Sequence, residues 1–248
     1  MSIDLAVIGG TGLYNFPGLE NVEKRAIATP YGDASGAIVF GTLGGRRIAF
    51  LARHGEDHRF APHRVNYRAN VWALHNAGAR RIVGVNAVGG IRGDMGPRAV
   101  AVPDQLIDYT HGRLTSFSDA DGVKVEHIDF SEPYSASLRR DLLAAAATSK
   151  TPVVDGGCYG ATQGPRLETR AEIERLRRDG CDLVGMTGMP EAALARELKI
   201  DYACLALVAN WAAGCGDETV ISLDEIFENL HAATAQVPAI ISALLGAD

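Results

Sequence analysis

The sequence predicts an α/β fold in which helices flank a central, largely parallel or mixed β-sheet. Short apolar runs rich in β-branched residues recur along the chain, as is typical of buried strands. Segments with helical periodicity lie between these runs, and this alternation favours a sheet covered by helices. Because 248 residues suit one large domain, we expect residues 1–248 to form a single domain.

Eight apolar runs are predicted as strands. Each is short and dominated by valine, isoleucine, leucine or alanine, which suits a strand that is buried on both faces. In chain order they are Ile3–Ile8, Ala37–Leu43, Arg47–Ala52, Arg81–Ala87, Ala99–Ile107, Val153–Tyr159, Asp182–Met186 and Tyr202–Val208.

Helices are predicted from helical patterns and from residues that favour helix ends. Thr169 with Glu172, and Ser222 with Glu225, have the spacing of a capping box, which satisfies free amide groups at a helix start. No clear period appears between Thr110 and Ser131, which we interpret as a long loop. The segments with helical patterns are Val65–Asn76, Ser135–Ala147, Pro190–Lys199 and Leu223–Leu245.

Composition excludes several classes of function. Apolar residues at 47% and charged residues at 22% are typical of a soluble globular protein. A formal net charge of −6 without a Lys/Arg-rich run argues against nucleic-acid binding. No apolar stretch reaches the ~18 residues needed to cross a membrane, and the start of the chain lacks the features of a signal peptide. We therefore expect a cytoplasmic protein that acts on small molecules, with its four cysteines reduced.

Two segments have residues suited to an anion. Gly9–Gly12 follows the first predicted strand, where glycines let backbone amides approach an anion and Thr11 adds a hydroxyl. It matches neither a dinucleotide fingerprint nor a P-loop. Arg53 and His54 follow a later strand and offer several donors to phosphate or carboxylate. Each pattern alone is equally compatible with a structural turn or a solvated surface pair.

The region around His54 also suggests a metal-dependent hydrolase. Zinc hydrolases use two histidines four residues apart on a helix, and this region holds several candidate ligands. Gly55 and Pro62 disfavour such a helix, so we expect no metal. The candidate ligands are His54, Glu56, Asp57, His58 and His63.

Polar residues also follow other predicted strands. They lie in Asn86–Gly90, Met186–Gly188 and Asn210–Trp211. Ligands of open α/β sheets bind at the carboxyl ends of strands, so these segments are candidates for one shared site.

Together these segments resemble the family of trimeric purine nucleoside phosphorylases and methylthioadenosine phosphorylases. The resemblance implies a nucleoside phosphorylase-like mixed sheet that is partly barrel-like, and a homotrimer. It implies a purine nucleoside as substrate, inorganic phosphate as co-substrate and no cofactor. The stretches that match the family, in its order, are Ile8–Leu13, Leu51–Gly55, Val65–Leu74, Gly164–Glu172 and Met186–Glu191.

The resemblance also implies roles for individual residues. Met186 lines the sugar, and His127 reaches the 5′ end of the substrate in a neighbouring subunit. His54, Glu168 and Asn210 are the expected catalytic residues. The phosphate site is expected to consist of Thr11, Arg53, His54, Asn86, Ala87 and Thr187.

The expected base is a 6-oxopurine. Where methylthioadenosine phosphorylases have two aspartates, this chain has Asn210 and Ala212. An asparagine amide can accept from the N7–H of the base and donate to a 6-oxo oxygen. The Glu168 carboxylate can accept the N1–H that adenine lacks, although a carboxylate there would also support the adjacent helix start. Leu167 stands where relatives stack an aromatic ring on the base.

The expected 5′ group is methylthio. Inosine and guanosine phosphorylases place a histidine near the 5′-hydroxyl from the last helix, and here Leu223 and Ile226 stand in that region. Apolar side chains favour a thioether over a hydroxyl. We therefore expect phosphorolysis of 5′-methylthioinosine. The alternatives are an inosine/guanosine phosphorylase, then a methylthioadenosine phosphorylase, and outside this class the metal-dependent hydrolase or a non-catalytic nucleoside-binding protein.

Overall fold

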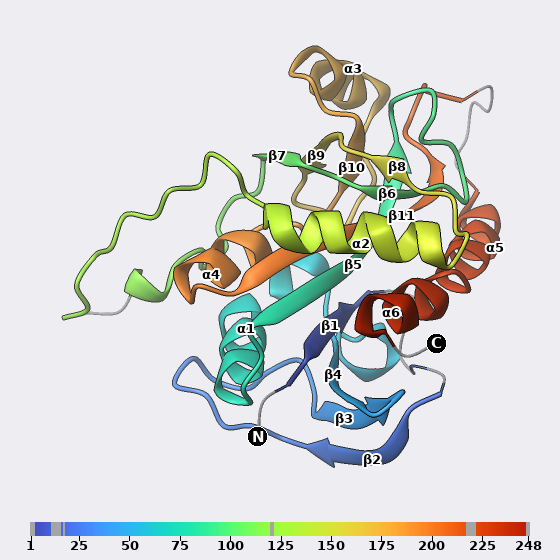
Figure 1. The fold of residues 1–248 in the computed structure, drawn as a ribbon. Helices are drawn as coiled ribbons and strands as arrows, with labels where there is room; N and C mark the ends of the chain where they lie inside the picture. Colours follow the sequence, from blue (N-terminus) through green and yellow to red (C-terminus); the bar gives the residue numbers. More distant parts are fainter. Residues whose placement is uncertain (1–2, 11–15, 17, 120–121, 217–221, 247–248) are drawn as a thin grey trace.

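A branched, mixed β-sheet of eleven strands forms the centre of the protein in a computed structural model that describes residues 3–10, 16, 18–119, 122–216 and 222–246 (Figure 1). Its strands are β1 (Leu5–Gly9), β2 (Glu20–Arg25), β3 (Ile38–Leu43), β4 (Arg46–Ala52), β5 (Arg81–Gly90), β6 (Val100–Val102), β7 (Gln105–Asp108), β8 (Val154–Asp155), β9 (Cys158–Ala161), β10 (Leu183–Gly185) and β11 (Asp201–Trp211).

The long strand β5 is the branch point of the sheet. It pairs in parallel with β1 and β11, and its last residues pair antiparallel with β10. Two residues separate β6 from β7, and two separate β8 from β9, so each pair forms one bent ribbon. Strand β11 pairs with β6 of the first ribbon, and the two ribbons pair with each other through β6–β8 and β7–β9. Strand β9 of the second ribbon pairs with β10, which returns to β5, so the pairings close a ring. The expectation of a mixed, partly barrel-like sheet is confirmed.

Two strand predictions needed correction, and one strand was not predicted. Ala99–Ile107 is divided because Pro103, which lacks an N–H, interrupts the ladder, and Val153–Tyr159 is divided at two glycines with positive φ. Strand β2 was not predicted, because all six of its residues are exposed and show no apolar alternation. It forms as an edge strand through antiparallel pairing with β3.

The helices follow the predicted pattern except at the end of the chain. The predicted single helix Leu223–Leu245 is wrong, because Pro238 cannot donate a backbone hydrogen bond to the preceding turn and the chain forms two helices there. The helices are α1 (Tyr67–Asn76), α2 (Ala136–Thr148), α3 (Arg170–Arg178), α4 (Glu191–Glu197), α5 (Leu223–Thr234) and α6 (Val237–Leu245).

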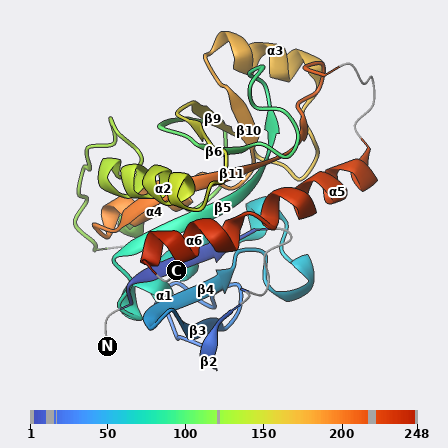
Figure 2. The same cartoon turned by 45° about the vertical axis from the view of Figure 1, so that its right-hand side comes forward.

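Two apolar layers cover opposite faces of the sheet. Side chains of α1 and α4 pack on one face, against alternate residues of β11 such as Cys204 and Val208. Side chains of α2, α5 and α6 pack on the other face, against the intervening residues such as Leu205 and Leu207. Figures 1 and 2 both show α2, α5 and α6 lying together on this second face. The alternation along β11 explains why that strand is apolar on both sides.

Helix α3 stands at the far end of the sheet and packs on a separate small cluster that includes Ile173 and Leu176 (Figure 2). Thr169 and Glu172 form the predicted capping box at its start. The residues just before α3, including Glu168, are therefore held by a defined helix end. In the part of the chain that the structure describes, no helix is long and apolar enough to cross a membrane.

Candidate active site

One pocket collects most of the residues singled out in the sequence. It opens at the carboxyl ends of β1, β4, β5, β10 and β11, where an α/β sheet binds its ligands. The residues that line it are Gly10, Arg53, His54, His58, Pro62, Ala87, Val88, Gly89, Leu167, Glu168, Val184, Gly185, Met186, Thr187, Ala209, Asn210, Ala212, Ala213 and Ile226.

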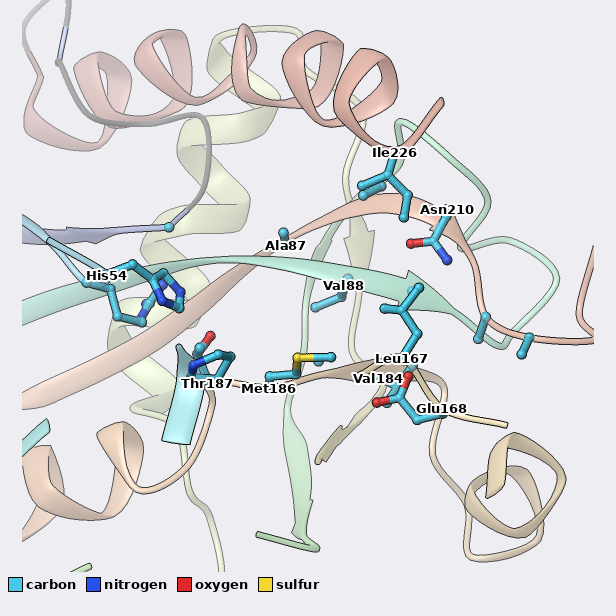
Figure 3. A pocket seen from close by; sticks show the side chains of 18 of the residues that line it. His54, Ala87, Val88, Leu167, Glu168, Val184, Met186, Thr187, Asn210 and Ile226 are labelled. Atoms are coloured by element: carbon cyan, nitrogen blue, oxygen red, sulfur yellow. The ribbon is translucent and has the colours of Figure 1, made fainter. Parts of the chain in front are cut away.

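The pocket has two chemically different ends. Figure 3 shows His54 and Thr187 at one end and Glu168, Asn210 and Ile226 at the other, with Met186 between them. His54 and Thr187 belong to the predicted phosphate site, and Glu168, Asn210 and Ile226 belong to the predicted base and 5′ sites. This spacing matches a nucleoside placed between an anion and a base-recognition site.

Arg53 is fully buried at the anion end, where its guanidinium is already engaged. Its Nε and Nη2 donate to the two carboxylate oxygens of Glu191, at 2.8 and 2.7 Å. Nη1 donates to Val85 O at 2.8 Å, and Nη2 also donates to Ile8 O at 3.3 Å. The bidentate fork is therefore bound to Glu191 rather than left open for phosphate.

His54 contributes a neutral imidazole. Its Nδ1 lies 2.8 Å from Phe60 O, so this nitrogen carries a proton and donates, which leaves Nε2 as an acceptor. Burial, followed by the charge of Arg53, lowers the pKa of His54 to about 4. The ring stacks on His58, with centroids 4.2 Å apart.

Thr187 presents a hydroxyl whose oxygen is already used. Asn86 Nδ2 donates to Thr187 Oγ1 at 2.7 Å, so the hydroxyl proton of Thr187 remains for another acceptor. Asn86 is fully buried and does not line the pocket. It therefore lies behind Thr187 and orients the Thr187 hydroxyl.

At the other end of the pocket, Glu168 is oriented by a neighbour. The hydroxyl of Thr162, just after β9, donates to Glu168 Oε1 at 2.6 Å and also lies 3.3 Å from Gly185 O. One carboxylate oxygen is thereby fixed, and the other is available to a ligand in the pocket.

The Asn210 amide has a defined orientation. The register of β11 against β5 shifts between Val208 and Asn210, a bulge of the kind that redirects a side chain beside an active site. Asn210 Nδ2 donates to Trp211 O at 2.6 Å. Figure 3 shows the amide oxygen on the side of Ala87 and Met186, so it faces into the pocket as an acceptor.

Two predicted substrate residues do not line this pocket. Leu223, the first residue of α5, is 64% exposed and does not line the pocket, whereas Ile226 one turn later does. His127 is exposed in the long loop and does not line the pocket of its own chain. Thr11 lies outside the described residues.

Two residues that support the pocket from behind were not singled out in the sequence. Arg113, in the aperiodic loop, donates to Met186 O at 2.8 Å and to Met189 O at 2.6 Å, and its other donors reach the carbonyls of Thr162 and Gln163. It thus joins the segment before Glu168 to the segment that carries Met186. Glu191 is the last residue of a stretch that matches the family. An acidic residue this close to a predicted anion site is the clue that could have revealed it.

The histidine-rich segment is not an α-helix. It forms two short 3₁₀ turns, Glu56–His58 and Pro62–Arg64, preceded by Gly55 at φ 73°. Among the described residues, no three His, Cys, Asp or Glu side chains gather so that they could hold a metal ion.

Known proteins match this chain over almost its whole length. A family model described as the phosphorylase superfamily matches residues 4–246. A probable S-methyl-5′-thioinosine phosphorylase of Xanthomonas campestris pv. campestris is 58% identical over 98% of this chain and 97% of its own length. The 6-oxopurine nucleoside phosphorylase of Pyrococcus furiosus is 45% identical over 85% of this chain and 80% of its own length.

Solved structures agree with these matches. A methylthioadenosine phosphorylase from an antarctic soil metagenomic library has a TM-score of 0.92 and 38% identity, covering 99% of this chain and 86% of that one. The common fold and the sequence matches both extend through the strands that form the pocket. The chain therefore belongs to the phosphorylase superfamily.

Proposed function

We propose that this protein catalyses the phosphorolysis of 5′-methylthioinosine to hypoxanthine and 5-methylthioribose 1-phosphate. The observation that carries the proposal is the pairing of Glu168 and Asn210 at one end of a pocket whose other end holds Arg53, His54 and Thr187. The substrate is also the one named for the Xanthomonas relative.

The pocket supports direct attack by phosphate on the sugar. Phosphate bound by Gly10, Arg53, His54 and Thr187 lies across Met186 from the base, so it approaches C1′ from the face opposite the purine. The bond from C1′ to the base breaks with its electron pair going to the purine, and a phosphate oxygen bonds to C1′. Hydrogen phosphate loses one proton and the leaving base gains one. The protein contributes mainly positioning and stabilisation of developing charge.

Glu168 and Asn210 select a 6-oxopurine in this proposal. The free Glu168 oxygen accepts from N1–H, and the inward-facing Asn210 oxygen accepts from N7–H as charge develops on the leaving base. With adenine, the N1 lone pair would instead face a carboxylate. A mismatch of this kind at a buried polar contact reduces kcat/KM by orders of magnitude.

The 5′ side favours the methylthio group. Ile226 from α5 is an apolar residue on that side of the pocket, and it packs against the apolar layer formed with α2, α5 and α6. We further propose a homotrimer in which His127, exposed on its loop, completes the 5′ end of a neighbouring pocket. In this proposal phosphate is the co-substrate and no cofactor takes part. That the reaction takes place in the cytoplasm stays a prediction.

The decisive experiment compares kcat/KM for 5′-methylthioinosine, inosine and 5′-methylthioadenosine with saturating phosphate. We expect 5′-methylthioinosine to be preferred over both. Preference for inosine would refute the 5′-group assignment, and preference for 5′-methylthioadenosine would refute the base assignment. Cleavage undiminished without phosphate, or abolished by a chelator, would indicate a hydrolase instead.

A further inference from the structure

A buried ion pair lies directly behind the anion end of the pocket. The side chains of Arg53 and Glu191 both have zero exposure, and their closest charged atoms are 2.7 Å apart. Tyr202, from β11, donates its hydroxyl to Glu191 Oε1 at 2.8 Å. Gly84 leaves room for this arrangement, because a Cβ there would overlap the Tyr202 hydroxyl and lie 2.9 Å from Glu191 Oε1. The carboxylate is thus held in a specifically shaped site.

The ion pair and two carbonyl groups occupy most of the N–H donors of Arg53. A guanidinium has five N–H donors. Four of them point to Glu191 Oε1 and Oε2, Val85 O and Ile8 O. The remaining proton is on Nη1, which would lie 3.2 Å from a Cβ at Gly10, a residue that lines the pocket. Glycine at this position lets the anion approach that single donor.

The pair also removes most of the positive charge from the anion end. Among the lining residues that the structure describes, Arg53 is the one lysine or arginine. Burial lowers the pKa of both His54 and His58, which keeps the two imidazoles neutral at pH 7. Because the Glu191 charge cancels that of Arg53, an anion would be held mainly by uncharged donors such as the Thr187 hydroxyl.

We propose that Glu191 is a positioning residue that restricts Arg53 to one donor and cancels its charge, so that phosphate binds weakly enough for rapid exchange. The inference deepens the proposed phosphorolysis and rests on it. A purely structural ion pair would lower phosphate binding when broken. A charge-cancelling pair predicts the opposite change, because loss of Glu191 leaves an uncompensated cation beside the anion.

The test is isothermal titration of inorganic phosphate into the wild type and Glu191→Gln. For a separation of ~8 Å between the carboxylate and a bound anion and an effective dielectric of about 20, removing one charge should tighten phosphate binding by about thirtyfold. We expect kcat to fall because the sugar phosphate leaves slowly. Unchanged or weaker phosphate binding in a folded Glu191→Gln protein would overturn the proposal.

Two further variants keep the test decisive. Glu197→Gln makes the same substitution at the end of the same helix, where the carboxylate accepts from Phe117 N, and it should leave the phosphate Kd unchanged. If Glu191→Gln does not fold, the neutral double variant Arg53→Gln/Glu191→Gln avoids an unpaired buried charge. It should bind phosphate within about tenfold of the wild type, since one hydrogen bond is lost. A loss greater than about tenfold would refute the charge cancellation.

Failure of this inference is distinguishable from failure of the proposed function. Phosphorolysis of 5′-methylthioinosine by the wild type tests the function on its own. A wild type that is active while Glu191→Gln shows no tighter phosphate binding contradicts only the role given to Glu191.

Discussion

The hydroxyl of Thr162 provides a selective test of base recognition. Replacing it in Thr162→Val keeps the side-chain shape and removes the 2.6 Å hydrogen bond to Glu168 Oε1. Glu168 would then no longer be held for the N1–H of a 6-oxopurine. The variant should therefore lose activity on 5′-methylthioinosine and change little on 5′-methylthioadenosine, whose adenine lacks N1–H.

The size of the effect follows from the strength of that bond. A hydrogen bond to a charged group contributes about 1.5–3 kcal/mol, and the lower end applies because both residues are only half-buried. About 1.4 kcal/mol corresponds to a tenfold fall in kcat/KM. Steady-state kinetics with both nucleosides measure this fall in kcat/KM. Thr162→Ser, which retains the hydroxyl, is the control variant. An equal loss on both nucleosides, or none on 5′-methylthioinosine, would refute this account of base selection.

Three other predictions test separate parts of the site. Asn210→Asp replaces the amide with an acid that can protonate N7 while facing a 6-amino group, so relative kcat/KM should shift toward 5′-methylthioadenosine; an unchanged ratio would mean that Asn210 does not contact the base. His127→Ala should raise KM for 5′-methylthioinosine while hypoxanthine binding stays constant, and equal weakening of both would place His127 elsewhere. Because the pKa of His54 falls from 6.5 to about 4 in the folded state, unfolding free energy should decrease by about 3 kcal/mol from pH 6.5 to pH 4 as the unfolded chain takes up the proton. Denaturant titrations of the wild type and His54→Gln check this, and identical slopes with pH would contradict it.

The sequence alone was sufficient to predict most of the strands and helices. Strand β1 is apolar throughout and β4 is apolar from Ile48 onward, and the capping box at Thr169 and Glu172 is a local motif, so these features were predictable from neighbouring residues. Strand β2 and the break before Pro238 were not predicted. Strand β2 depends on pairing with β3, which no local pattern shows. The break depends on a single proline, which interrupts an otherwise helical pattern.

The sequence also identified most residues of the pocket, because glycines and polar side chains follow apolar strands that end at the same edge of a parallel sheet. It indicated a shared site for Arg53, His54, Glu168 and Asn210, and the pocket contains all four. What it determined was therefore the family, the kind of sheet and the candidate side chains.

Only the tertiary structure decided what those side chains bind. Arg53 and Glu191 are 138 positions apart, and Asn86 and Thr187 are 101 apart, so no local pattern links them. An arginine's five donors have many possible acceptors, and the acceptors are chosen by how the sheet brings distant strand ends together. For that reason the sequence predicts an arginine at the anion site, whereas the fold determines that Glu191 holds its fork and leaves one donor toward the pocket.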